Sequence, residues 1–239
     1  MATNLSHNAV AAPYGIFASS TTQELPLGTR FVDQSGNAYR YVKAGGTALV
    51  VGTLLQAAAE ATNHQNLTAP ASAIGVTSVA VTLGATAATA NQYAEGWMVI
   101  TVTPGVGYKY RISSHPAADA SASLTVTLDD AIQIALTSSS RIDLLRNPYN
   151  AVIVYPTTAT GAAVGVAVYP IAASSFGFIQ SSGSAVILSD GGSTVGTNVS
   201  ASNATAGSVE AAVTAQAFVG VAMTGVATTE YGSFLIHLD

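Results

Sequence analysis

Short segments in which apolar and polar residues alternate are the feature that most constrains this chain. The clearest are residues 124–128 (LTVTL), 99–103 (VITVT) and 108–112 (YKYRI). Because successive side chains of a β-strand point to opposite faces, this period of two predicts strands with one buried face. Two candidate helices, residues 50–61 and 208–217, lack the sustained helical period of about 3.6 residues. The chain is therefore expected to be all-β, folded as β-sandwich or barrel-like lobes.

An internal duplication is the most specific pattern in the chain. Residues 39–50 (YRYVKAGGTALV) align without gaps with residues 176–187 (FGFIQSSGSAVI). After a short insertion in the second copy, residues 51–55 (VGTLL) match residues 195–199 (VGTNV). The pattern predicts a duplicated hairpin, in which an aromatic strand turns at Gly-x-Ala, returns as an apolar strand and meets a tight Val-Gly-Thr turn.

The sequence divides into three predicted segments: an extended N-terminal arm at 1–24, a first β-domain at 25–150 and a second β-domain at 151–239. The boundary between the two domains follows from the Asn-Pro-Tyr-Asn turn at 147–150 and from the charge distribution, since all 7 Lys and Arg residues precede it. An alternative stays open, in which one composite domain contains both copies of the duplication and residues 84–148 form an inserted β-lobe.

The predicted arm, residues 1–24, is built from small and polar residues and is almost uncharged. Such a segment has too little apolar surface to fold by itself. Tyr14, Ile16 and Phe17 are isolated anchors in it, and we expect them to bind a partner. Two interpretations remain, a frayed terminus or a segment that lies extended along another protein.

Charge is scarce along the whole chain. Only 8% of the residues are charged, whereas a soluble domain carries about 25%. The net charge of −5 argues against a nucleic-acid partner, because binding phosphates requires cations. No segment approaches the roughly 20 apolar residues of a transmembrane helix, so no membrane partner is expected, and the first residues lack a signal-peptide pattern. A surface with so few ions indicates a protein that lies against other proteins.

No motif for catalysis or metal binding stands out. The chain has no cysteine, and its histidines lack the spacing of a metal site: His7, His64, His115 and His237. Asp129 and Asp130, adjacent after a strand, fit a solvated turn better than an acid–base pair, and Asp190 before two glycines fits a turn. We expect no enzymatic activity, no cofactor and no metal.

Aromatic side chains on the predicted strands raise one alternative. They are candidates to line a carbohydrate-binding groove, although at alternating strand positions such residues more often pack in cores and interfaces. The set is Tyr39, Tyr41, Tyr93, Trp97, Tyr108, Tyr110, Phe176 and Phe178.

The end of the chain carries a recognisable pattern. In residues 218–236 (FVGVAMTGVATTEYGSFLI), a Gly-containing apolar strand that ends in Ala precedes a short Gly-containing loop and a final apolar strand. This pattern resembles the closing motif of the capsid decoration, or cement, proteins of tailed bacteriophages. Residues 41–52 (YVKAGGTALVVG) are also similar to phage virion structural proteins.

The resemblance implies a structural virion protein that is made in the host cytoplasm and binds the capsid exterior. Its partners would be the major capsid protein and further copies of itself, often in a homotrimer, and it would strengthen the head against internal DNA pressure. Two other functions remain open: a different virion component from the tail, baseplate or head fibre, and a carbohydrate-binding β-module.

Overall fold

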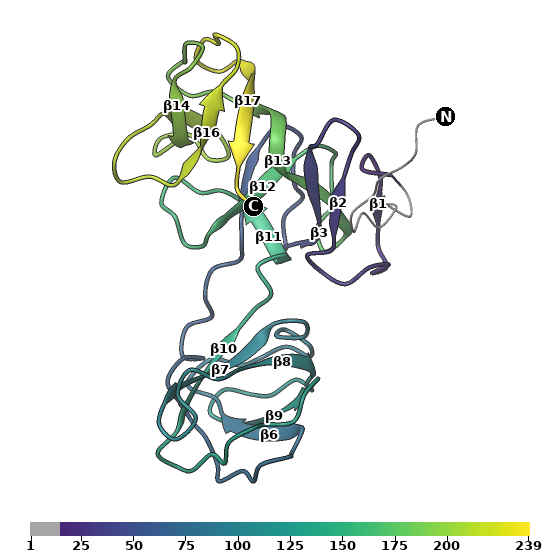
Figure 1. The fold of residues 1–239 in the computed structure, drawn as a ribbon, viewed down its shortest axis with the longest axis vertical. Helices are drawn as coiled ribbons and strands as arrows, with labels where there is room; N and C mark the ends of the chain where they lie inside the picture. Colours follow the sequence, from purple (N-terminus) through teal and green to yellow (C-terminus); the bar gives the residue numbers. More distant parts are fainter. Residues whose placement is uncertain (1–14) are drawn as a thin grey trace. The chain divides into compact units, whose positions relative to one another are not determined.

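Every regular element in the described part of the chain, residues 15–239 of the computed structural model, is a β-strand. The strands form two compact units, one made of residues 15–59 and 148–239 (unit 1) and one of residues 60–147 (unit 2) (Figure 1). The prediction of an all-β chain with barrel-like lobes is confirmed.

The strands of unit 1 are β1 (Ser19–Ser20), β2 (Arg30–Val32), β3 (Ala38–Ala44), β4 (Leu54–Gln56), β11 (Asn150–Val154), β12 (Ala163–Ala167), β13 (Phe176–Leu188), β14 (Asn198–Ala201), β15 (Val209–Ala211), β16 (Phe218–Ala222) and β17 (Tyr231–His237). The strands of unit 2 are β5 (Leu67–Thr68), β6 (Ser78–Thr82), β7 (Trp97–Val102), β8 (Lys109–Ser114), β9 (Ser123–Leu128) and β10 (Arg141–Leu145).

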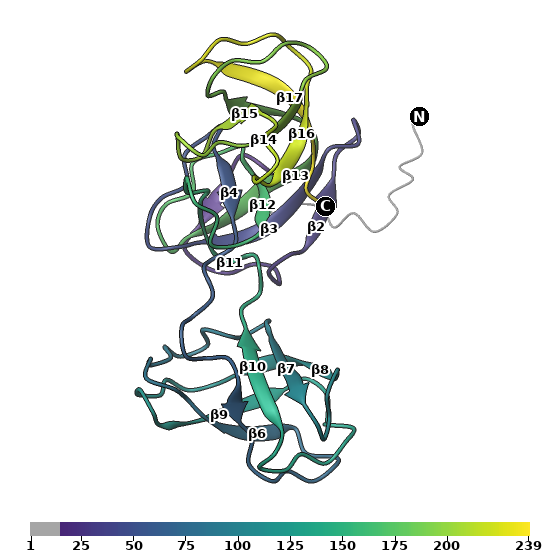
Figure 2. The same cartoon turned by 90° about the vertical axis from the view of Figure 1, so that its left-hand side faces the viewer.

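Unit 1 contains a closed barrel. Strands β13, β12, β4, β11 and β3 follow one another in hydrogen-bonded order, and β3 pairs again with β13 to close the ring. Figure 2 shows these strands from the side. Closure leaves the barrel without a free edge. The apolar side chains that fill it come from two distant segments, residues 42–57 and 152–179: Val42, Ala44, Leu49, Leu55, Ala57, Val152, Val164, Ala167, Ile171 and Ile179.

Strand β13 belongs to two sheets at once. The first half of its 13 residues pairs with β3 and β12, and its second half pairs with β17. Gly183 lies where the partner changes and has a φ of 97°. A Cβ at this position would lie 2.2 Å from Asn37 Oδ1, so both the backbone conformation and the space require glycine.

The second half of β13 supports the remaining strands of unit 1. The order β13, β17, β16, β14, β15 forms an antiparallel extension of the barrel sheet. Its inner face packs on a separate core, made of Leu54, Tyr155, Val166, Ala185, Ile187, Val199, Ala201, Val209, Val219, Ala222, Phe234 and Ile236. The closing motif at 218–236 is thus the hairpin of β16 and β17.

Unit 2 is a smaller antiparallel sheet with the strand order β5, β10, β7, β8, β9, β6 (Figure 2). The alternation that predicted strands at 99–103, 108–112 and 124–128 reappears as buried and exposed side chains in β7, β8 and β9. A single core of eighteen buried residues lies behind the strands, with Tyr93, Met98, Ile100, Ile112 and Ile132 among the largest.

The units do not follow the predicted boundary at 150. Residues 25–150 are not one body, because β3 and β4 pair with β11, β12 and β13 rather than with strands of 60–147. The observed division has the form of the alternative, a composite domain with an insertion, but the insertion begins at residue 60 and not at 84. The last of the Lys and Arg residues, Arg146, lies next to the end of this insertion at residue 147.

A paired-turn motif occurs twice in each unit. In every instance two residues outside the strands exchange both backbone hydrogen bonds, and each is followed by a turn that leads into a strand. The pairs are Leu49 with Ile171 and Ser193 with Val226 in unit 1, and Ser72 with Leu136 and Ala88 with Ala118 in unit 2. All but Leu136 are followed three residues later by a residue with positive φ: Gly52, Ser174, Gly196, Thr229, Gly75, Asn91 and Ser121.

The predicted duplicated hairpin is wrong in its second copy. β3 ends at Ala44 before two glycines, whereas β13 continues from Phe176 to Leu188 without a turn. The reason is that β17 provides a hydrogen-bonding partner for residues 182–188. What the two copies share is the Val-Gly-Thr turn, where Gly52 and Gly196 both have positive φ within a paired-turn motif.

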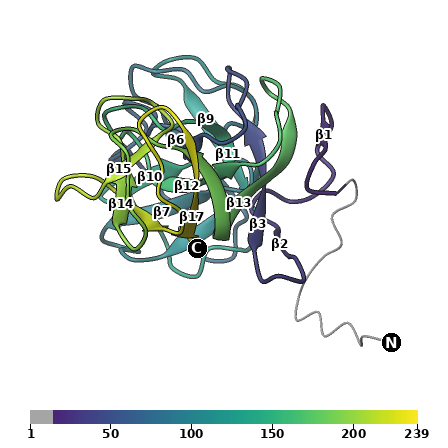
Figure 3. The same ribbon diagram turned by 90° about the horizontal axis from the view of Figure 1, so that it is seen from above.

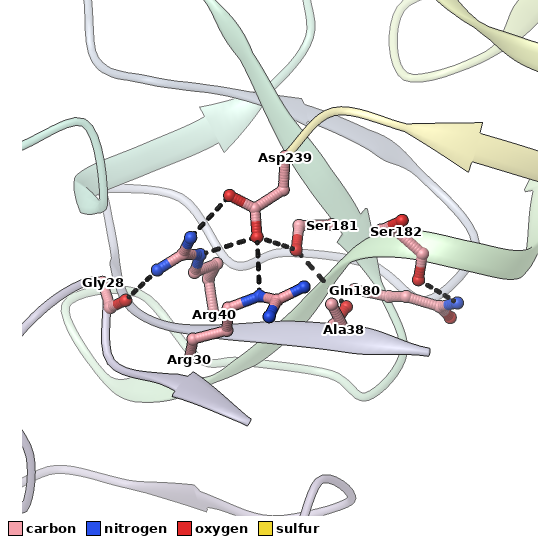
Figure 4. A network of polar contacts seen from close by, with 8 residues as sticks. All are labelled: Gly28, Arg30, Ala38, Arg40, Gln180, Ser181, Ser182 and Asp239. Carbon is pink, nitrogen blue, oxygen red and sulfur yellow. Dashed lines mark hydrogen bonds and ion pairs between the residues drawn. The ribbon is translucent and has the colours of Figure 1, made fainter. Parts of the chain in front are cut away.

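A polar network ties the end of β17 to the barrel (Figure 4). The Asp239 carboxylate accepts hydrogen bonds from Arg40 Nε at 2.9 Å, Arg40 Nη2 at 2.5 Å and Arg30 Nε at 3.3 Å. Ser181 Oγ donates to it at 3.2 Å, and Arg40 Nη1 donates to the Gly28 carbonyl at 2.8 Å. Partial burial alone would raise the pKa of Asp239, but Arg40, Ser181 and Arg30 lower it below 3.8. The network therefore stabilises unit 1 above the carboxyl's unfolded pKa, and this contribution is lost as the pH falls through the folded pKa.

We predict unequal costs for removing the two arginines. Arg40 is largely buried and forms a bidentate ion pair with Asp239, so Arg40→Ala should lower the free energy of unfolding by about 1.5–3 kcal/mol. Arg30 is half-exposed and makes one long contact, so Arg30→Ala should cost about 0–1 kcal/mol. Urea unfolding followed by far-UV circular dichroism measures both, and equal costs would contradict this account.

We also predict that the β16–β17 hairpin depends on Gly220. A Cβ there would lie 2.0 Å from the Leu235 carbonyl oxygen, which is backbone and has no room to move. Gly220→Ala should therefore destabilise unit 1 by about 1–3 kcal/mol or more in thermal unfolding. Gly225→Ala is the matched control in the same motif, since the nearest atom to its Cβ would be 3.9 Å away, and its effect should stay within about 0.5 kcal/mol.

Candidate interaction surface

The described end of the predicted arm lies on its own unit. Residues 15–20, here called the strap, contain β1, which pairs antiparallel with the start of β13 through Ser19 with Gly177 and Ser20 with Phe176 (Figure 3). Beneath the strap is an aromatic cluster of Leu27, Tyr39, Tyr41, Phe176 and Phe178. Glycine at 177 allows the close approach, because a Cβ there would lie 3.2 Å from the Ala18 carbonyl oxygen and 2.8 Å from Ile171 Cδ1.

The structure places the predicted anchors differently. Ile16 is half-buried and packs on the aromatic cluster. Phe17, next to it in the turn, is 65% exposed and free to contact another molecule. Tyr14 lies outside the described residues. Ile16 therefore holds the strap on its own unit, whereas Phe17 points outward.

The strap is held by few interactions. Within residues 15–239 it forms no ion pair, and its one side-chain hydrogen bond is local, from Thr22 N–H to Ser20 Oγ at 3.0 Å. A hollow of about 10 Å³ remains between the strap and the cluster, lined by residues that include Ala18, Tyr41 and Phe178. That is room for about one water molecule. After the strap, the chain is held more firmly to unit 1, since the Glu24 N–H donates to Tyr41 Oη at 3.0 Å.

A second surface feature is the outer face of the sheet formed by β13, β17 and β16. We call it the closing face, because the closing motif provides most of it: Ser184, Val186, Leu188, Val221, Met223, Tyr231, Ser233, Leu235 and His237. Its most exposed apolar members are Val186 at 57% and Tyr231 at 54%. None of its residues is Asp, Glu, Lys or Arg.

Neighbouring strands make this face continuous. Leu235 lies opposite Ser184 on one side and Val221 on the other, and Ser233 lies opposite Val186. The Oγ atoms of Ser184 and Ser233 are hydrogen-bonded to each other at 3.0 Å. An exposed sheet face that combines large apolar groups with small hydroxyl groups and no charge is suited to a protein partner.

Sequence reasoning missed the closing face. In residues 234–236 (FLI) every position is apolar, so no alternation separates the buried Phe234 and Ile236 from the exposed Leu235. The signal that was available is the final strand's lack of charge, because a solvent-facing strand side usually carries polar residues.

The aromatic residues considered for a glycan groove are divided between the units. Tyr39, Tyr41, Phe176 and Phe178 are buried in the cluster of unit 1, and Tyr93 and Tyr110 are buried in unit 2. Trp97 is half-buried with Lys109 Nζ 4.6 Å from its ring centroid, and Tyr108 is exposed and stacked on Tyr110. The set therefore does not line a single groove.

Two of the three acidic residues singled out in the sequence, Asp129 and Asp190, have structural partners. Asp129 is exposed and lies 3.3 Å from Arg111 Nη1, and Asp130 is exposed beside it. Asp190 accepts a hydrogen bond from Ser202 Oγ at 2.5 Å. Across residues 15–239, no cluster of three or more potential metal ligands is present, and no helix there is long and apolar enough to cross a bilayer.

Two histidines form a buried network in unit 2. His115 Nε2 accepts a hydrogen bond from the Tyr93 N–H at 2.9 Å, so its Nδ1 carries the proton and donates to the Pro116 carbonyl at 2.7 Å. His64 Nε2 contacts the Thr86 carbonyl at 2.8 Å, which leaves Nδ1 to accept from Tyr93 Oη. The His115 ring is thus held in its neutral form, with one ring nitrogen accepting and the other donating a hydrogen bond.

The titration behaviour of this network follows from its burial. Burial lowers the pKa of His115 below 6.5, against the opposing effect of its bond to Pro116. Burial also raises the pKa of Tyr93 to about 12, so its hydroxyl keeps the proton that it shares with His64.

Comparison of the chain with protein-family profiles, with curated proteins and with solved structures finds no match. The function must therefore be argued from the chain's own surface.

We predict that unit 2 loses stability in mild acid. Because the folded pKa of His115 is lowered, its neutral form stabilises the unit fully above about pH 6.5, and the contribution falls as the pH drops below that value. Trp97, the one tryptophan of the chain, lies in unit 2, so urea unfolding followed by its fluorescence should show a lower midpoint at pH 5 than at pH 7.5.

Two variants test the assignment to His115. His115→Gln should lower stability at pH 7.5 and reduce the difference between the two pH values. His237→Gln, an exposed histidine of unit 1, should leave both unchanged. An undiminished pH dependence in His115→Gln would contradict the prediction.

Proposed function

We propose that the chain is a non-enzymatic structural protein of a phage virion, which binds the outer surface of the capsid and stabilises it. Its partners in this proposal are the major capsid protein and further copies of itself in a homotrimer. The observation that carries the proposal is the closing face, an exposed and uncharged sheet surface built largely by the residues that resemble the closing motif of decoration proteins.

The physical properties of this face support a large protein partner. An apolar surface gains about 25 cal/mol for each Å² removed from water. Burying a charged group without a partner is the main cost of burying a polar surface. The closing face has no Asp, Glu, Lys or Arg, so docking would bury no unpaired charge from this chain. The same argument extends to the whole chain, since 8% charge leaves much of the surface available for close protein contacts.

The division of the aromatic residues weakens the carbohydrate-binding alternative. A glycan platform needs several exposed rings on one surface, and here most rings are buried and lie in two different units. The alternative of a tail, baseplate or head-fibre component draws on the same closing face and is distinguished by the binding experiment.

We expect a charged closing face to abolish capsid binding. The double variant Tyr231→Asp with Leu235→Asp places two carboxylates in the proposed interface, so its affinity for empty shells of the major capsid protein should fall at least about ten-fold. Cosedimentation with shells measures this, and light scattering on the free protein should give about three times the chain mass of 23.9 kDa.

The control is Ile74→Asp, an apolar residue of unit 2 that is 64% exposed and lies outside the closing face. It should bind shells within about two-fold of the unchanged protein. Binding by the double variant as tight as that of the control would overturn the assignment of the interface. Failure of the unchanged protein to bind shells would overturn the decoration function and favour another place in the virion.

A further inference from the structure

We propose that the strap is exchangeable: residues 15–20 of one copy take the place of the strap on β13 of a neighbouring copy. The site is the aromatic cluster and the adjoining edge of β13, and the occupant is a second copy of this chain. This goes beyond the proposed function, because it needs only two copies at high concentration.

The strap's binding site, formed by the start of β13 and the aromatic cluster, is shaped for the strap. The structure shows that the strap fits the start of β13 and the cluster, with Ile16 against the aromatic rings and Gly177 shaped for its backbone. An identical strap from another copy finds the same hydrogen bonds and the same contacts. Exchange of an identical element therefore costs little in contact energy.

The weak hold on the strap is the second argument. It pairs with β13 over two residues, has a hollow beneath it, and leaves Phe17 outside the packing. Residues 21–23 that follow are exposed, and the chain becomes fixed again at Glu24 and Leu27. A short connection between a loosely held terminal strand and a firm body is the usual hinge for an exchange.

The absence of charge is the third argument. Residues 2–23 contain no Asp, Glu, Lys or Arg. An uncharged strap adds no repulsion between crowded copies. Because the site on a neighbouring copy is identical to the strap's own site, the choice between them depends on concentration. A short flexible linker gives an effective concentration on the order of 1 mM. The strap is thus expected to stay on its own unit in dilute solution and to exchange when copies are crowded to about that level.

Crowding of this kind arises on any surface that binds many copies side by side. Exchange from each copy to the next around a ring would then link the copies through backbone hydrogen bonds and the aromatic cluster. Three copies exchanging in this way would form a closed, head-to-tail ring.

The test is a photo-cross-linking experiment on the full chain. Phe17→Cys introduces the only cysteine, at an exposed position, and carries a maleimide-benzophenone. Labelled protein is mixed from copies grown in ¹⁴N and in ¹⁵N, illuminated and digested, and mass spectrometry counts strap-to-β13 cross-links that join the two isotopes. These must come from different copies.

We expect these mixed-isotope cross-links to rise at least about ten-fold in share between about 10 μM and about 1 mM protein. They should map to β13 near Gly177. Ile74→Cys with the same label is the matched control, since Ile74 is 64% exposed and Phe17 is 65% exposed. Its mixed-isotope cross-links report random collisions.

Two results would overturn the proposal. One is strap-to-β13 cross-links that stay within a single isotope up to about 1 mM. The other is mixed-isotope cross-links to β13 that are no more frequent from Phe17 than from Ile74. Neither result bears on capsid binding, because the shell experiment alters Tyr231 and Leu235 and leaves the strap intact.

Discussion

The fold of unit 1 depends on one long strand. β13 closes the barrel with its first half, supports the closing hairpin with its second half, and offers its starting edge to the strap. Gly183 lets the strand change partners without a break, because its φ of 97° and the nearby Asn37 exclude other residues. Both surfaces considered for function are therefore positioned by the same strand, at its two ends. The Asp239 network fastens the end of β17 back to Arg40 of β3, which joins the hairpin to the barrel a second time.

The all-β character could be predicted because the strands of unit 2 alternate regularly, as in residues 124–128. The topology could not, because pairing between distant segments leaves no local signal: β3 pairs with β13 and β11, both more than a hundred residues away. The repeat shows the same limit. The shared Val-Gly-Thr segments revealed two paired-turn motifs, because both use glycine at the positive-φ position. The facing turns of the same two motifs use Ser174 and Thr229, and the turns of unit 2 use Gly75, Asn91 and Ser121, so no common residue marks the motif in the sequence.

The candidate surfaces divide in a similar way. Composition pointed to Ile16 as an anchor for a partner, and Ile16 does pack on aromatic rings, but the rings belong to the same chain. Composition cannot distinguish a partner from the chain's own sheet, since the contacts are chemically the same. The closing face was hidden because Leu235 stands between two buried apolar residues, and only the pairing of β17 with β13 and β16 shows which side is exposed. The link between the buried histidines through Tyr93 could not be read from the sequence, because it joins residues that only folding brings together.

The strands on either side of the insertion have one more consequence. In unit 1, β4 and β11 are antiparallel neighbours, with Gln56 opposite Ile153, so the chain leaves and rejoins the barrel at adjacent points. In unit 2, β5 and β10 are likewise neighbours, with Thr68 opposite Arg141. A module whose two ends meet on adjacent strands can be replaced by another of any size at little cost in loop-closure entropy. The barrel can therefore accept a different domain in place of residues 60–147, by evolution or by protein engineering. The strands that form the closing face would stay intact.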